Sequence, residues 1–348
     1  MSKEKQYYRG LDVLRGICAV LIVLYHYTAR YNESPYTTEE LQTNWPFSLT
    51  WGSMAVVTFF LLSGFLSGVY EQEQHSPIFQ YVKKRVIRLY PAFLVGLALT
   101  SLITFFFYKE AFVGFKDILL NLTMLPGLLG AKPVDGVYWT LQYEIIFYAF
   151  TVFLLFIPKL KWKKGIFCVW ILGAIAFRFF GWEIDGFIFS AVRLFLIPNY
   201  MQTFVLGICI KEISLKKGNW ATYALIVLCF VNHFLYLGWK SSLFLLISAL
   251  FVLYVTAINE KSILNRDNKF TKFFGWLAGI SYALYLVHQN IGYAMIRIFV
   301  ANGLTNQVFV LIPIAVSVLL AWLIHRFVEE PIGKCLKKKL KERERSNG

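Results

Sequence analysis

Long apolar runs alternate with short polar and basic segments along most of the chain. An α-helix needs about 20 apolar residues to cross the hydrocarbon core of a bilayer. Ten runs have this length or come close to it: 11–29, 52–70, 86–108, 137–157, 165–181, 194–212, 220–237, 241–258, 273–299 and 308–327. The run 165–181 is short, and Pro198 interrupts the run 194–212. The pattern predicts an all-α polytopic membrane protein with about ten transmembrane helices.

Composition supports the membrane class. Of the 348 residues, 57% are apolar and only 16% are charged, whereas a soluble domain carries about 25% charged residues. The net charge of +15 does not indicate nucleic-acid binding, because the basic residues recur between apolar runs and do not gather in one place. We expect one transmembrane domain over 1–333 and a basic cytoplasmic tail over 334–348, attracted to anionic lipid headgroups.

Lysine and arginine predict the orientation. Alternate connections, which include both ends of the chain, hold 26 basic residues, and the opposite side holds eight. The excess of positive charge marks the cytoplasmic side, so both termini are expected there. The longest outer connections are Tyr31–Trp51 and Tyr108–Gly136. Within the second one, the apolar stretch Ile118–Leu129 is expected to cover an outward-facing site at the membrane surface.

Ionisable residues inside the predicted spans are functional candidates by default. With a helical rise of about 1.5 Å per residue, His26 and His288 each lie roughly 22 Å above the cytoplasmic end of their spans. Glu144 lies roughly 10 Å below the outer end of its span. In a core of about 30 Å these three side chains share one level. Arg15 lies lower, near the cytoplasmic face, about 16 Å from His26 along the same helix.

A histidine and a carboxylate at one depth suit general-base catalysis, in which the carboxylate orients the imidazole and stabilises the imidazolium. His26 and Glu144 are the catalytic candidates. Each has another explanation: His26 as a buried hydrogen-bonding link between helices, Glu144 as a protonated packing residue or an ion ligand. For His288 the residues alone leave hydrogen bonding between helices and substrate binding open.

Arg15 either extends to the inner interface beside Asp12, or meets an anionic ligand, since guanidinium groups bind phosphate bidentately. Arg85 and Arg88 begin the third predicted span on one face, as membrane anchors, phosphate ligands or both. Ser63, Gly64 and Gly68 give the second span a small-residue face that favours close helix packing. The five cysteines show no CxxC spacing, so neither a disulfide nor a metal site is expected.

Six motifs in order resemble acyltransferase family 3, a family of integral membrane acyltransferases. They begin with Gly10-Leu-Asp-Val-Leu-Arg15-Gly, followed eleven positions after Arg15 by His26. The others are Phe59-Phe-Leu-Leu-Ser63-Gly64-Phe-Leu, Arg85-Val-Ile-Arg88-Leu-Tyr-Pro91, Trp139-Thr-Leu-Gln-Tyr-Glu144-Ile-Ile-Phe-Tyr148, Ser281-Tyr-Ala-Leu-Tyr285-Leu-Val-His288 and Glu329-Glu330-Pro331. The resemblance runs through nearly the whole chain.

The resemblance implies a ten-helix acyltransferase of the plasma membrane, of bacterial type. It would take an acyl group, often acetyl, from cytoplasmic acyl-CoA as co-substrate, with no permanently bound cofactor. The acceptor would be a hydroxyl of a cell-surface polysaccharide or its lipid-linked precursor. Arg15, Arg85 and Arg88 would hold the phosphates of CoA, and His26 with Glu144 would carry the chemistry. Ser63, Trp139, Tyr285 and His288 would contact the substrate.

Several alternatives stay open at this point. Ten helices with charges near the bilayer midplane also describe a proton-coupled transporter, although no inverted repeat is visible. Direct transfer and a transient acyl group on His26 are both compatible with the residues. The identity of the acceptor, acetyl against a longer acyl group, and a homodimer against a monomer are not fixed by the sequence.

Overall fold

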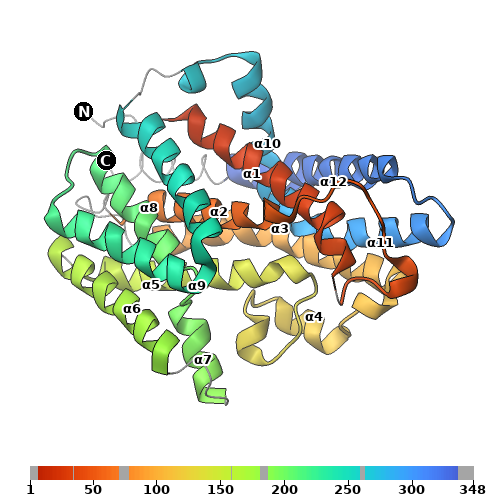
Figure 1. The fold of residues 1–348 in the computed structure, drawn as a ribbon, viewed down its shortest axis with the longest axis horizontal. Coiled ribbons are helices and arrows are strands. Elements are labelled where there is room, and N and C mark those ends of the chain that lie inside the picture. The colour runs from red at the N-terminus through yellow and green to blue at the C-terminus, as the bar shows by residue number, and fades with distance from the viewer. Residues whose placement is uncertain are drawn as a thin grey trace. The chain divides into compact units, whose positions relative to one another are not determined.

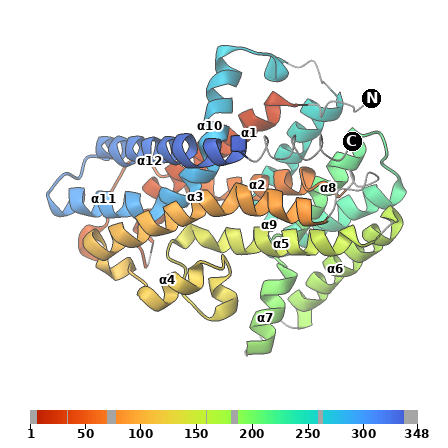
Figure 2. The same ribbon diagram turned by 180° about the vertical axis from the view of Figure 1, so that it is seen from behind.

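The computed structural model describes residues 7–33, 35–69, 78–157, 159–180, 187–258 and 263–335, and it is helical without a β-strand in these ranges. Figures 1 and 2 show the helices from two sides. They are α1 (Arg9–Thr28), α2 (Ala55–Phe65), α3 (Ile78–Phe107), α4 (Phe115–Asn121), α5 (Trp139–Leu155), α6 (Leu160–Phe180), α7 (Phe187–Leu196), α8 (Met201–Ser214), α9 (Trp220–Leu253), α10 (Lys269–Val287), α11 (Gln289–Ala301) and α12 (Leu311–Ile324).

The all-α, multi-pass architecture predicted from the apolar runs is confirmed. Within the described residues, seven helical stretches are long and apolar enough to cross a membrane, and Thr50–Phe65 forms a shorter apolar helix. The seven are Arg9–Asn32, Ile78–Phe107, Gly136–Leu155, Val192–Ser214, Trp220–Ala257, Lys269–Val287 and Gln307–Cys335. The exact count of ten and the cytoplasmic location of both termini stay predictions. Most of the basic tail expected over 334–348 lies outside the described residues.

Two predicted spans correspond to the single helix α9. Gly238 interrupts it with a φ of +73° and a ψ of −179°, which are not helical values. Nε2 of His233 and Oγ of Ser241 lie 2.9 Å apart. Eight residues of straight helix would separate these residues by about 12 Å. The chain therefore folds back at Gly238, and the predicted division between 220–237 and 241–258 is observed.

One predicted span is divided instead. The run 273–299 forms α10 and α11, which meet at His288 and run in different directions (Figures 1 and 2). The prediction of one straight span across this run is therefore wrong. A strong sequence signal for a break, such as proline, is missing between Leu284 and Asn290. The break instead places an imidazole at the junction of two helices.

The chain divides into two compact units, each assembled from separate segments. The first comprises Met1–Cys18, Ser53–Ser76 and Gln142–Trp276, and the second comprises Ala19–Gly52, Pro77–Leu141 and Leu277–Gly348. In the first unit, α2 and α8 approach closely through glycine. A Cβ on Gly64 would lie 2.0 Å from the carbonyl oxygen of Phe204, and one on Gly207 would lie 2.0 Å from that of Leu61.

The predicted small-residue face of the second span is therefore confirmed at Gly64 but not at Gly68. Helix α2 ends at Phe65, and Gly68 lies beyond it with a φ of +79° and open space around its Cα. Gly68 thus permits a left-handed turn and takes no part in helix packing.

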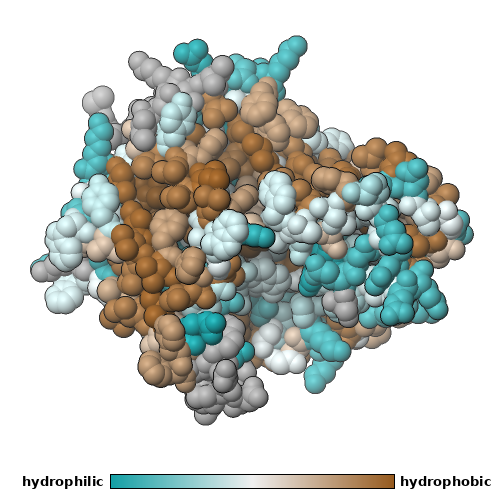
Figure 3. Space-filling model, viewed as in Figure 1, coloured by the Kyte–Doolittle hydropathy of each residue, from teal (hydrophilic) through white to brown (hydrophobic). Residues whose placement is uncertain are grey.

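The surface of the first unit is apolar along α9, as expected for a lipid-facing helix. Val227, Phe234, Ile247 and Leu250 are each more than half exposed there. Figure 3 shows hydrophobic surface over α9, whereas hydrophilic residues of the second unit gather over the segment that follows α1.

Candidate active site

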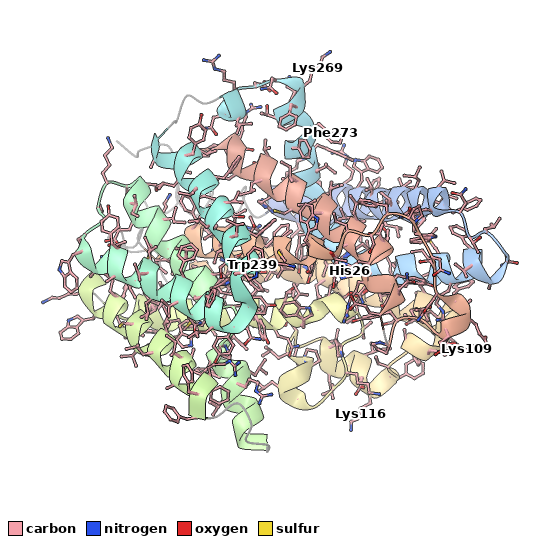
Figure 4. All side chains as sticks on the ribbon, in the orientation of Figure 1. His26, Lys109, Lys116, Trp239, Lys269 and Phe273 are labelled. Atoms are coloured by element: carbon pink, nitrogen blue, oxygen red, sulfur yellow. The ribbon has the colours of Figure 1, made fainter. Side chains whose placement is uncertain are left out.

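His26 lies in the last turn of α1, where Figure 4 labels it, and its side chain is only 8% exposed. Its Nδ1 lies 2.9 Å from the carbonyl oxygen of Ile22, one helical turn earlier. A carbonyl oxygen only accepts hydrogen bonds, so this contact places the proton on Nδ1 of His26. The helix itself therefore selects the tautomer of the imidazole.

His288 is the second imidazole of the site and is fully buried. Its Nδ1 lies 3.1 Å from the carbonyl oxygen of Leu284 and 3.0 Å from that of Tyr285, so this nitrogen also carries the proton. Its Nε2 is left as an acceptor and lies 3.1 Å from Nδ1 of His26. The two rings meet edge to face, with centroids 4.8 Å apart. Of the three side chains that the helical rise placed at one depth, His26 and His288 are direct neighbours.

The arrangement leaves one nitrogen of the pair with an available lone pair. In His26 the Nδ1 proton is shared between Ile22 and His288, so Nε2 is the unprotonated atom. Among the described residues, Nε2 of His26 has no hydrogen bond. A buried imidazole with a fixed tautomer and an open basic nitrogen has the features required of a general base.

The backbone of His288 is held as firmly as its ring. Its carbonyl oxygen accepts a hydrogen bond of 2.6 Å from the hydroxyl of Tyr27, the residue next to His26. Ser317 of α12 lies 2.7 Å from the same hydroxyl and donates to it. Gly292 allows this approach, since a Cβ there would lie 2.3 Å from the ring of Tyr27. Helices α1, α11 and α12 are thus fixed to one another beside the imidazole pair.

Asp135 lies close to the pair and was missed by sequence reasoning, which examined only charges inside the apolar runs. Its carboxylate is fully buried, and it accepts the backbone N–H of Val137 at 3.2 Å and that of Asn290 at 3.1 Å. Burial raises the pKa of the Asp135 carboxyl to about 7, although these two hydrogen bonds favour the charged form. The available signal was an Asp two residues after Pro133, just ahead of the Trp139 motif.

Glu144 belongs to the first unit, where it accepts hydrogen bonds from Ser63, at 3.0 Å, and from Tyr148. Ser63 is thus bonded to a carboxylate of a neighbouring helix. The ring of His26 is oriented by Ile22 and His288 of its own unit. The predicted roles of Glu144 as the catalytic partner and of Ser63 as a substrate contact stay predictions.

The three arginines predicted to bind phosphate lie near the beginnings of α1 and α3. Arg15 contacts Asp12 at 3.4 Å, and its side chain is 21% exposed. The guanidinium of Arg85 lies over the ring of Tyr81, and Arg88 is exposed. Arg15 belongs to the first unit and the other two to the second. Their role as ligands of CoA is untested by these contacts.

Tyr285 and Trp139 are predicted to contact substrate, and Tyr285 lies one helical turn before His288 in the sequence. The hydroxyl of Tyr285 donates to the carbonyl oxygen of Val137 at 2.6 Å and lies 2.6 Å from Oγ1 of Thr140. Trp139, half-buried, begins α5. The Tyr285 hydroxyl therefore ties α10 to the start of α5. Among the described residues, His, Cys, Asp and Glu form no group able to hold a metal ion.

Comparison with known proteins gives one family match across most of the chain. The model of a family described as an acyltransferase domain matches residues 8–326. A Staphylococcus aureus (strain COL) protein named "Putative O-acetyltransferase SACOL0978" is 26% identical over 95% of this chain and 58% of its own length. Nodulation protein 10 of Rhizobium leguminosarum bv. viciae is 29% identical over 36% of this chain and 39% of its own length. The chain thus spans less than two thirds of both relatives, and no solved structure matches it.

Proposed function

Because this chain belongs to the acyltransferase family whose model spans residues 8–326, we propose that it transfers acyl groups across the membrane in which its helices lie. The donor is cytoplasmic acyl-CoA, with acetyl as the group carried. The acceptor is a hydroxyl on the extracytoplasmic side, on a cell-surface polysaccharide or its lipid-linked precursor, and the membrane is a bacterial plasma membrane. The names of the staphylococcal relatives support O-acetyl transfer.

One observation carries the proposal: the tautomer and environment of His26. Both Nδ1 atoms of the imidazole pair are bonded to carbonyl oxygens, and Nδ1 of His26 also faces Nε2 of His288. A base in this state accepts a proton on Nε2, and the imidazolium that forms then donates from Nδ1 to a ready acceptor. A neutral histidine takes the place that a carboxylate occupies in a Ser-His-Asp triad.

The proposed reaction balances without a further reagent. Nε2 of His26 removes the proton of the acceptor hydroxyl while the oxygen attacks the carbonyl carbon of the thioester. The C–S bond breaks, an ester C–O bond forms, and the CoA thiolate leaves. The imidazolium returns its proton to the sulfur. We favour direct transfer over an acyl-histidine intermediate, because Nε2 of His26 then serves as base and acid in one cycle.

The remaining site residues keep the roles that the family resemblance implies. Arg15, Arg85 and Arg88 bind the phosphates of acyl-CoA near the cytoplasmic ends of α1 and α3. Glu144, held by Ser63 and Tyr148, acts with His26 in catalysis. Ser63, Trp139, Tyr285 and His288 contact the substrates, and His288 does so while it is bonded to His26.

The proposed phosphate role of Arg15 predicts the effect of its removal. Because guanidinium binds phosphate through paired hydrogen bonds, Arg15→Ala should raise KM for acetyl-CoA about tenfold, a cost typical of a lost charged hydrogen bond. Arg326→Ala is the control, since Arg326 is exposed and paired with Glu330. An unchanged KM in Arg15→Ala would assign Arg15 to the membrane interface and to Asp12 alone.

Labelling of membrane vesicles tests the function as a whole. Radiolabelled acetyl-CoA is added to inside-out vesicles that contain the protein, and base-labile label is measured in the glycan and lipid fractions. We expect the label to appear as an ester on the lumenal side, and only in vesicles that contain the protein. Label that enters the lumen without ester formation would indicate a carrier, and absence of both would refute acyl transfer from acetyl-CoA.

A further inference from the structure

Two hydrogen bonds, both donated by Asn290 in the first turn of α11, join that turn to Val134 and Asp135. The carboxylate accepts the backbone N–H of Asn290, and Nδ2 of Asn290 donates to the carbonyl oxygen of Val134 at 2.9 Å. Asn290 is two positions after His288. The contact therefore fixes the helix turn that carries the second imidazole of the site.

The same two segments are joined again on the other side of His288. We use the term clamp for four hydrogen bonds between residues 134–138 and 285–290. They are the two Asn290 bonds to Asp135 and Val134, the bond of Tyr285 to Val137, and the bond of Tyr138 to Leu286 at 3.2 Å. The clamp bonds to residues on both sides of His288. His288 therefore cannot shift along the helix axis without breaking hydrogen bonds of the clamp.

The position presents two backbone donors that match the two oxygens of a carboxyl group. Oδ1 of Asp135 faces the N–H of Val137 and Oδ2 faces the N–H of Asn290, so two acceptors meet two donors. An asparagine has one acceptor oxygen and would turn its own N–H group toward the second donor. The site is fully buried, and a donor left there without a partner is destabilising because it loses its hydration. Gly136 lets the segment approach, because a Cβ there would lie 2.3 Å from Nε2 of Gln289.

We propose that Asp135 is the positioning residue of the imidazole pair: through the clamp it holds Nε2 of His288 against Nδ1 of His26. The proposal rests on the proposed function, in which that contact stabilises the imidazolium of His26. Asp135 does not touch the reacting atoms. It acts through α11, and its contribution is to fix the distance of 3.1 Å between Nε2 of His288 and Nδ1 of His26.

Asp135→Asn in the full-length protein tests the proposal, with two measurements. The first is kcat and KM for acetyl-CoA in inside-out vesicles, normalised to folded protein. We expect kcat to fall about tenfold, the effect of one unpartnered buried donor, with KM within twofold. The second is the ¹⁵N signals of the histidine rings in ¹⁵N-histidine-labelled protein in detergent, assigned with His288→Gln. We expect the His288 signals to move away from those of the Nδ1-protonated tautomer.

Asp117→Asn is the matched control. Asp117 lies on the same connection and also accepts a backbone N–H, that of Lys132 at 3.3 Å, but it takes no part in the clamp. We expect wild-type kcat and wild-type ring signals. Asn290→Ala serves if Asp135→Asn does not fold, since it keeps the carboxylate and deletes the bond to Val134. A smaller loss of kcat, of about threefold, is expected for a single hydrogen bond between neutral groups.

The outcomes separate the proposal from the function on which it rests. If Asp135→Asn and Asn290→Ala keep wild-type kcat and wild-type ring signals, the positioning role is wrong, while acyl transfer by the wild-type protein stands. A lower unfolding temperature with both readouts unchanged would assign Asp135 to stability alone and would also overturn it. If the wild type forms no ester, the proposed function fails, and the ring signals still decide whether Asp135 holds His288.

Discussion

A buried histidine in a membrane protein is costly unless its ring nitrogens find partners. The site contains two buried histidines, and they differ in how many of their ring nitrogens have hydrogen-bond partners. Both nitrogens of His288 are bonded, to carbonyl oxygens and to His26. His26 has partners for Nδ1, and Nε2 has none among the described residues. At the scale of single residues, this asymmetry supports the proposal in which His26 is the reacting group and His288 supports it.

Asp135 predicts a pH dependence of stability. Its pKa is raised from 3.8 to about 7 by burial, so the folded protein holds the proton more tightly than the unfolded chain. Its contribution to the free energy of unfolding is therefore largest below about pH 4, falls as the pH rises toward 7, and is constant above that. The titratable groups that face Asp135 are the tyrosines Tyr27, Tyr138 and Tyr293.

Thermal unfolding in detergent at pH 5 and pH 7.5 measures this contribution. Wild-type protein should lose more stability between the two values than Asp135→Asn, whose side chain does not titrate. Asp117→Asn should keep the wild-type difference. Identical pH profiles for wild type and Asp135→Asn would mean that the carboxyl of Asp135 does not titrate between these values.

At the scale of helices, the apolar runs located most of the long helices and the division at Gly238, but not the bend at His288. The bend at His288 carries no proline. The ring of His288 bonds there to the carbonyl oxygens of Leu284 and Tyr285, contacts that a sequence does not display. The helical rise predicted a shared depth for His26 and His288. Asp135 was not predicted, because only charged residues inside the predicted spans were considered and Asp135 lies just outside one.

The close contact of α2 with α8 predicts the effect of adding one methyl group. A Cβ on Gly207 would lie 2.0 Å from the backbone oxygen of Leu61, so the helices must separate. Gly207→Ala should lower the free energy of unfolding by about 1–3 kcal/mol, as overpacking does in other cores. Gly173→Ala on α6 is the control, with open space around its Cα and an expected gain of up to about 1 kcal/mol. Equal midpoints of thermal unfolding for both variants would contradict tight packing at Gly207.

At the scale of the whole molecule, the two compact units are interleaved along the chain. Helix α1 is continuous from Arg9 to Thr28 and contributes Arg15 to the first unit and His26 to the second. Such interleaving depends on contacts between distant segments, and hydrophobic pattern contains no information about them. The pattern and the positive charges do predict the orientation of the chain in the membrane.

Cys335 offers a test of that orientation. It is exposed at the end of the described chain, whereas Cys18, Cys209 and Cys229 are buried. If the C-terminal side is cytoplasmic, a membrane-impermeant maleimide should label Cys335 in inside-out vesicles and not in intact cells. Glu39→Cys in a Cys335→Ser background should show the reverse, because Glu39 lies on a predicted outer connection. Labelling of Cys335 in intact cells would show that the C-terminal side is extracytoplasmic. The proposed acyl-CoA site would then face away from the cytoplasm, which contradicts the proposal.

The central claim is that Nε2 of His26 is the base in acyl transfer, and its most direct test is the rate of transfer by His26→Gln. General-base catalysis contributes about 10²- to 10⁴-fold, so transfer from acetyl-CoA should fall at least about 100-fold while folding and acetyl-CoA binding are retained. His325→Gln, at a half-buried histidine paired with Glu329, should keep the wild-type rate. A correctly folded His26→Gln protein that transfers acetyl groups at the wild-type rate would contradict the account.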